Sequence, residues 1–166
     1  MGNPFDIDTN IGALVSKSHM EKVQSYIEIA KQENGTILYG GKPANVAGSE
    51  KGYYLQPTVI EIQDNQCRVN QEEIFGPVLS IIAYEDEDDA VKIANDTVYG
   101  LSGGVWASTK EKGIAIARRI RTGQIAVNGG AFNINAPLGG YKQSGVGREY
   151  SEYGFDEFLE IKSMQL

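Results

Sequence analysis

The sequence contains a single cysteine, Cys67, and a single histidine, His19, among its 166 residues. One cysteine cannot form an intrachain disulfide, which fits a reducing compartment, and we expect a cytoplasmic protein. One histidine without a second histidine or a cysteine close to it in sequence does not give the ligand spacing of a zinc site. We therefore expect no metal centre and interpret His19 as a surface residue.

Basic residues are also scarce, with 15 Lys and Arg against 22 Asp and Glu, which gives a formal net charge of −7. Nucleic acids and anionic membrane surfaces select basic patches, so neither is an expected partner. The sequence has no apolar run approaching about 18 residues, and its N-terminus lacks a basic segment followed by an apolar one. These absences predict neither a membrane span nor a signal peptide.

Hydrophobic residues make up 41% of the chain, enough for one domain to bury a core. Apolar residues at helical spacing predict a helix over 16–34, followed by a short strand over 36–39 and extended segments at 53–55 and 58–60. Residues 78–84 form a nearly continuous apolar run that predicts a central strand covered on both faces.

Strand and helix patterns alternate after residue 84. They predict helices over 86–97 and 109–121 and strands over 101–107 and 124–128, and the acidic run 85–89 is interpreted as the N-terminal cap of the first helix. Such alternation favours an α/β fold with a largely parallel twisted sheet and helices on both faces. A last strand is predicted over 158–166, and its exposed edge requires a pairing partner.

Few residues suggest chemistry by themselves. Arg68 could lower the pKa of the neighbouring Cys67 thiol, but no histidine lies nearby to act as a base, so we interpret Cys67 as structural. Glu72 and Glu73 are adjacent and project in different directions, so they would not flank one scissile bond. Residues 145–150 begin like a dinucleotide-binding fingerprint but lack its third glycine. The residues alone indicate an acidic α/β domain without an assigned activity.

Three motifs carry a resemblance to a known family. Residues 71–78 read Gln-Glu-Glu-Ile-Phe-Gly-Pro-Val, which resembles the Glu-Glu-Ile-Phe-Gly-Pro-Val signature of the aldehyde dehydrogenase superfamily. Residues 95–106 resemble its Asn-x-x-x-Tyr-Gly-Leu segment. Residues 136–149 are similar to its Pro-Phe-Gly-Gly-x-Lys-x-Ser-Gly-x-Gly-Arg-Glu loop, and the resemblance covers essentially the whole chain.

The resemblance implies NAD or NADP as cofactor. It assigns to Glu73 the ribose hydroxyls on the nicotinamide side, for which a carboxylate is a suitable acceptor. Phe75 would pack near the nicotinamide, and Leu101 would border the same pocket. The segment of the family that discriminates NAD from NADP is not among the matched motifs.

The resemblance also implies an aldehyde tunnel lined by Phe132 and Leu138, where Leu138 replaces the phenylalanine that most members carry. Glu149 matches a glutamate linked to proton relay in some members. A salt bridge or loop anchor beside Arg148 is the alternative role for Glu149.

In the family, a cysteine thiolate attacks the aldehyde, hydride passes to NAD(P)+, and a glutamate-activated water hydrolyses the thioester. The matched region follows the family's nucleophile and general base, so we expect a C-terminal portion that is inactive alone. Residues 1–156 would belong to the catalytic domain, and 157–166 would be an oligomerisation strand. The expected partners are an aldehyde, the N-terminal remainder of the enzyme and further copies in a homo-oligomer.

Two alternatives remain open from the sequence. The chain could be a non-catalytic, structural or regulatory truncated product that associates with full-length subunits. It could also be one half of a split enzyme whose other polypeptide supplies the cysteine.

Overall fold

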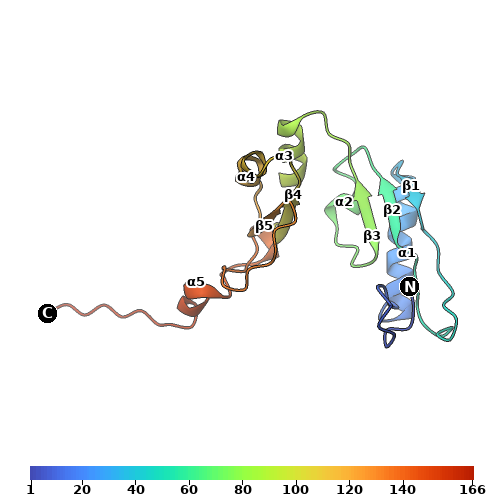
Figure 1. Cartoon of the computed structure of the whole chain (residues 1–166), viewed down its shortest axis with the longest axis horizontal. Coiled ribbons are helices and arrows are strands. Elements are labelled where there is room, and N and C mark those ends of the chain that lie inside the picture. Colours follow the sequence, from blue (N-terminus) through green and yellow to red (C-terminus); the bar gives the residue numbers. More distant parts are fainter. The chain divides into compact units, whose positions relative to one another are not determined.

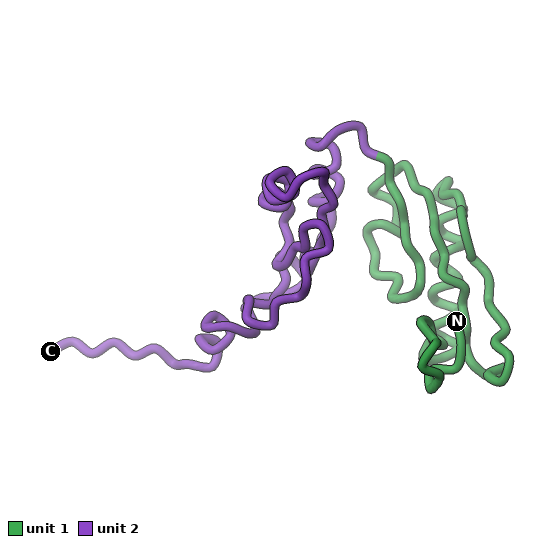
Figure 2. The backbone as a smooth tube through the Cα atoms, in the orientation of Figure 1, with its two compact units in different colours: residues 1–83 green, residues 84–166 purple.

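The computed structural model describes residues 1–166, which form two compact units, 1–83 and 84–166 (Figure 2). Each unit combines helices with a small sheet that contains a parallel strand pair. The α/β prediction is therefore confirmed, and the strands divide into one sheet of three and one of two. None of the helices has the length and apolar content needed to cross a lipid bilayer.

The first unit is organised around α1 (Lys17–Gln32), the helix predicted over 16–34. Ser16 caps its start, because the Ser16 hydroxyl accepts the backbone N–H of His19 at 3.1 Å and so satisfies a first-turn amide. The helix ends before Asn34, which adopts a left-handed φ of 64°. The buried face of α1 consists of Val23, Tyr26, Ile27 and Ala30.

This face packs on a sheet with the strand order β1 (Thr36–Tyr39), β2 (Thr58–Glu61), β3 (Val78–Ile81) (Figure 1). β1 is antiparallel to β2, whereas β2 and β3 are parallel with Thr58 opposite Val78. The prediction that 78–84 is a central strand covered on both faces was wrong for this unit. β3 lies at the edge with Leu79 and Ile81 exposed, because side chains alternate across a strand and only one face of this sheet packs on a helix.

The second unit is a βαβ arrangement preceded by α3 (Glu87–Asn95). β4 (Ser102–Val105) and β5 (Gln124–Val127) are parallel, and α4 (Lys110–Ala117) is the crossover between them, as predicted. The acidic run caps α3 as expected, since the Asp86 side chain accepts the backbone N–H of Asp89 at 2.9 Å. Thr109 caps α4 in the same way through the N–H of Lys112.

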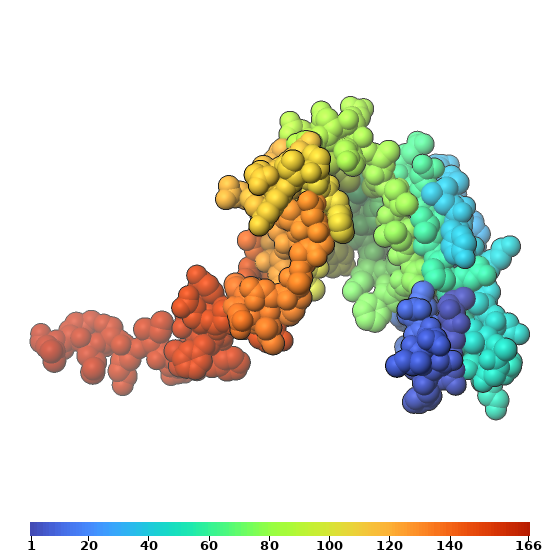
Figure 3. Space-filling model, viewed as in Figure 1, coloured from blue at the N-terminus to red at the C-terminus, as the bar shows by residue number.

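The chain after β5 has little regular structure. It contains a short 3-10 helix, η1 (Lys142–Ser144), and a last helix, α5 (Ser151–Asp156). The strand predicted over 158–166 is not formed: residues 159–166 carry no secondary structure and are exposed, and they stand clear of α5 in Figure 3. A strand needs a neighbour for its backbone hydrogen bonds, and nothing else in this chain supplies one. The oligomerisation role of 157–166 stays a prediction.

Candidate functional site

In the first unit, the segment 72–77 connects α2 (Arg68–Gln71) to β3 and carries two predicted site residues. Two side chains of helix α1 contact the backbone of this segment. The Nε2 atom of His19 lies 2.6 Å from the Phe75 carbonyl oxygen, and the Lys22 ammonium donates to the Glu73 carbonyl at 3.4 Å. A Cβ on Gly76 would lie 2.7 Å from both methyl groups of Val23, so only glycine allows this close approach to the helix.

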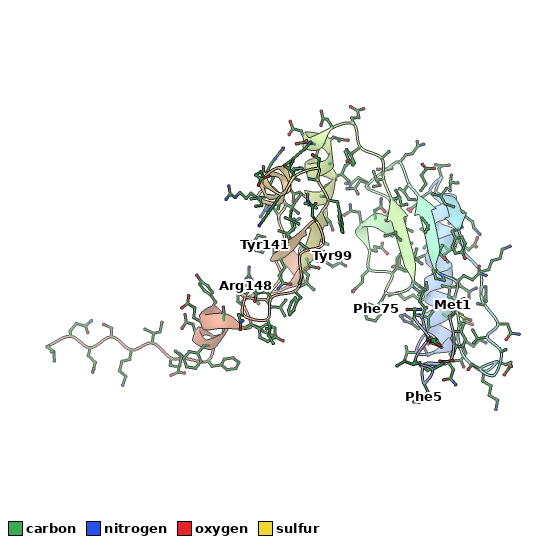
Figure 4. All side chains as sticks on the ribbon, in the orientation of Figure 1. Met1, Phe5, Phe75, Tyr99, Tyr141 and Arg148 are labelled. Carbon is green, nitrogen blue, oxygen red and sulfur yellow. The ribbon has the colours of Figure 1, made fainter.

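Phe75 has an unusual backbone conformation and an exposed ring. Its φ is 59°, in the left-handed region that residues with bulky side chains rarely adopt. The side chain of Phe75, labelled in Figure 4, is 72% exposed. Its ring meets the His19 imidazole edge-on at 5.9 Å between centroids. The segment therefore offers an aromatic surface to solvent, available for stacking.

Glu72 and Glu73 have different surroundings. The Glu72 carboxylate accepts two hydrogen bonds from Arg68, at 2.8 and 2.9 Å, and one from the Tyr26 hydroxyl at 2.7 Å. Donation from Arg68 is the main reason that the pKa of Glu72 falls to about 2, and the same carboxylate raises the pKa of Tyr26. The Glu73 carboxylate is exposed and has no hydrogen bond or ion pair within the chain. Of the two carboxylates, Glu73 is the one that remains free to bind a ligand.

In the second unit, the loop 138–149 is fastened to the residues before β4. The Ser144 hydroxyl accepts the backbone N–H of Gly100 at 2.9 Å, and the N–H of Tyr141 donates to the Gly100 carbonyl at 2.8 Å. A Cβ on Gly123 would overlap the carbonyl oxygen of Gly139, so the loop also touches the backbone just before β5. These contacts bring the loop against the start of both strands.

Lys142 forms a second fastening on the same loop. Its ammonium donates to the carbonyl oxygens of Asn95 at 2.8 Å and Thr97 at 2.9 Å, at the C-terminal end of α3. A cation at this end of a helix satisfies carbonyls that have no partner within the helix. The Asn95 side chain in turn bonds the backbone of Arg119 and Arg121, so one cluster connects α3, the residues after α4 and the loop.

A cavity of about 440 Å³ lies along this loop. Leu101, Leu138 and Glu149 all line it, and Leu138 and Glu149 pair through two backbone hydrogen bonds of 2.8 and 2.6 Å. The Arg148 guanidinium, also in the lining, donates to the carbonyls of Gly140 and Gly147 and lies over the Tyr141 ring at 5.3 Å (Figure 4). The cavity thus combines apolar walls with one guanidinium and carboxylates.

The structure brings together three of the six predicted site residues. Leu101, Leu138 and Glu149 share the cavity, whereas Phe132 is 65% exposed and outside its lining. Glu73 and Phe75 belong to the other unit. The salt-bridge alternative for Glu149 is not formed, since Arg148 bonds backbone carbonyls and Glu149 anchors the loop through its own backbone.

Sequence reasoning missed three residues, one in the first unit and two in the second. His19 was interpreted as a surface residue, although its ring holds the Phe75 carbonyl. Lys142 lies inside a recognised motif but was given no role, and Glu157 lines the cavity from beyond that motif. Of the three, only Lys142 carried a signal, its place in the matched loop.

The single thiol is not placed for chemistry. Cys67 is 6% exposed and packs in the core beside Val69. Burial raises the pKa of the Cys67 thiol, which keeps it in the weakly nucleophilic neutral form. No group of three or more His, Cys, Asp or Glu side chains is arranged to hold a metal ion.

Known proteins are similar to this chain in sequence and in structure. A Staphylococcus saprophyticus protein named as an aldehyde dehydrogenase is 46% identical over 164 residues, which are 99% of this chain and 34% of that protein. A betaine aldehyde dehydrogenase structure from Staphylococcus aureus superposes with a TM-score of 0.89 at 40% identity, covering 96% of this chain and 32% of that one. A Mycobacterium tuberculosis aldehyde dehydrogenase complexed with NAD+ gives a TM-score of 0.84 at 45% identity, covering 89% and 30%.

The chain spans about a third of the length of the relatives that it matches. The sequence profile described as the aldehyde dehydrogenase family matches residues 1–164, nearly the whole chain. With the three motifs, the α/β fold and the structural neighbours in agreement, the chain belongs to the aldehyde dehydrogenase family.

Proposed function

We propose that this chain supplies the nicotinamide-side cofactor contacts and part of the aldehyde pocket of an enzyme that oxidises an aldehyde to a carboxylic acid with NAD(P)+. The observation that carries this proposal is that the carboxylates of the two adjacent glutamates differ in their hydrogen bonding. Glu72 is held by Arg68 and Tyr26, which leaves the Glu73 carboxylate free in the same segment as the exposed Phe75 ring.

The residues present fit the nicotinamide end of the cofactor. A free carboxylate accepts hydrogen bonds from the two ribose hydroxyls, which suits Glu73. The exposed Phe75 ring offers a flat apolar face to the nicotinamide. NAD(P)+, when bound, accepts the hydride that leaves the aldehyde carbon.

For the aldehyde, we propose a pocket lined by Leu138 and Phe132. Leu138 faces the cavity, while Phe132 is exposed and would contribute from the loop after β5. A leucine in place of a phenylalanine leaves more room and removes a stacking surface. The Glu149 carboxylate at the cavity would exchange protons with water that enters and leaves the site.

We further propose that the thiol that forms the thioester comes from polypeptide outside these 166 residues. Cys67 is the only cysteine here, and its burial and raised pKa oppose attack on an aldehyde. The chain alone would therefore bind but not oxidise the aldehyde.

The test is aldehyde oxidation by the purified chain over a panel of aliphatic and aromatic aldehydes with NAD+ or NADP+. Each assay is run alone and with the part of the Staphylococcus saprophyticus relative that lies outside the match. Activity only on mixing supports the proposal, and turnover by the chain alone contradicts it. Inactivity of the mixture, with both parts folded, would instead favour a non-catalytic role.

The neighbouring glutamates provide a matched pair for this assay. Glu73→Gln removes the proposed ribose acceptor and should raise KM for NAD+ about tenfold, the loss of one charge-assisted hydrogen bond. Glu72→Gln should leave KM for NAD+ nearly unchanged while destabilising the fold, because Glu72 bonds only within the chain. Equal effects of both variants on KM would contradict the assignment.

We also propose that 157–166 pairs as a strand with another subunit. Phe158, Ile161 and Met164 in this segment are largely exposed, and its backbone has no sheet partner within the chain. Light scattering should detect oligomers of the full chain that are lost when residues 157–166 are deleted. An unchanged molar mass would contradict the proposal.

A further inference from the structure

One face of α1 reaches the backbone of the segment 72–77. His19 and Lys22 are three residues apart and therefore neighbours on the helix surface. Their side chains contact the carbonyl oxygens of Phe75 and Glu73. A carbonyl oxygen only accepts, so Nε2 of His19 carries the proton in the 2.6 Å hydrogen bond to Phe75.

The backbone that His19 holds is strained. A left-handed φ is unfavourable for phenylalanine and persists only where the surroundings impose it. The hydrogen bond fixes the direction of the Phe75 carbonyl, and the edge-on contact between the two rings, with an interplanar angle of 89°, restricts the Phe75 side chain. Both restraints come from one residue.

His19 itself stands on a rigid support. Its backbone N–H is bonded to the Ser16 cap, and α1 is anchored one turn later by Val23, which is fully buried. Val23 also contacts Gly76, and Lys22 bonds the Glu73 carbonyl, so the same helix contacts the backbone on both sides of Phe75. A ring oriented by such a support loses little entropy when a ligand stacks on it.

We propose that His19 is a positioning residue, which sets the backbone and ring of Phe75 for contact with the nicotinamide. This inference rests on the proposed function of Phe75. His19 does not touch the cofactor; it acts through the conformation of Phe75. Lys22, at 3.4 Å from the Glu73 carbonyl, makes the longer and weaker contact of the two.

The first test reads the conformation of Phe75 in the full chain by NMR, without cofactor. The imidazole nitrogen shifts should identify Nε2 of His19 as protonated. In His19→Ala, the Phe75 Cα shift should move away from its left-handed value and the Phe75 amide should become mobile on the nanosecond timescale. His19→Gln, whose amide can donate to the same carbonyl, should largely restore both signals.

Glu21→Gln is the matched control. It removes the exposed ion pair with Lys17 on the same helix and leaves the side-chain contacts of His19 in place. It should leave the Phe75 signals unchanged. Unchanged Phe75 shifts in His19→Ala, or a His19 ring protonated only at Nδ1, would overturn the inference whatever the cofactor does.

The second test uses the mixed enzyme described under the proposed function. His19→Ala should raise KM for NAD+ about fivefold with a smaller change in kcat, His19→Gln should remain within about twofold of wild type, and Glu21→Gln should match wild type. A KM for NAD+ unchanged in His19→Ala, together with a displaced Phe75, would overturn the positioning role. If the wild-type mixture is inactive, the proposed function fails, while the NMR result still decides whether His19 sets Phe75.

Discussion

Replacing Lys142 by methionine tests the hydrogen bonds that hold the loop 138–149 to the end of α3. Methionine keeps the approximate length of the side chain and removes the ammonium that donates to the carbonyls of Asn95 and Thr97. Hydrogen bonds from charged groups contribute about 1.5–3 kcal/mol each. Water can reach part of this half-buried site, and the freed side chain regains about 1–2 kcal/mol of rotamer entropy. We expect a net loss of about 2 kcal/mol.

Hydrogen exchange of the second unit measures this loss where it occurs. The amide protons of Gly100, Tyr141 and Gln143 form hydrogen bonds between the loop and the residues before β4. Their exchange should therefore accelerate about thirtyfold for a loss of about 2 kcal/mol. Lys110→Met is the control, because Lys110 is exposed and makes no such contact. Exchange that accelerates less than about threefold, or equally in both variants, would refute the reasoning.

Three further predictions follow from single contacts. The lowered pKa of Glu72, about 2 against an ordinary 4.5, means that its stabilising contribution is present above about pH 4.5 and lost as the pH falls toward 2. Glu72→Gln should therefore flatten the acid limb of urea unfolding measured against pH. Cys67 should react with iodoacetamide only as fast as the chain opens, and alkylation at the rate of a free thiol would contradict its burial. Gly123→Ala should cost about 1–3 kcal/mol in thermal unfolding, because its methyl group overlaps the Gly139 carbonyl, whereas Gly104→Ala should cost much less.

Local signals in the sequence were sufficient for most helices. Helix α1, and the capping role of the acidic run before α3, depend on residues within a few positions of one another. The βαβ arrangement of the second unit likewise follows from alternating patterns. Such interactions can be recognised from spacing because both partners lie in one short window.

Sheet position could not be recognised in this way. The apolar run 78–84 was assigned a central place, but β3 has Leu79 and Ile81 exposed at the edge of its sheet. An apolar strand sequence indicates that the strand is suited to burial, but it does not show which element packs against the strand or on which face. The same holds for 158–166, which was predicted as a strand and forms none within the chain.

The candidate site was accessible only in part. The motifs predicted roles for Glu73 and Glu149, but the contact between His19 and Phe75 joins residues 56 positions apart and has no sequence pattern. The difference in hydrogen bonding between the Glu72 and Glu73 carboxylates also depends on Tyr26, a residue of helix α1. These features arise from packing between elements, which propensity and spacing do not encode.

The segment 72–77 belongs to the connection between β2 and β3, which are parallel neighbours in one sheet. Thr58 lies opposite Val78, so α2 and the candidate cofactor segment are fixed at both ends by one sheet and on one side by α1. A synthetic peptide with the sequence of residues 68–78 would contain every letter of the motif but neither anchor. The conformation of the motif thus depends on the residues around it. Grafting the motif into another protein would require α1, β2 and β3 as well.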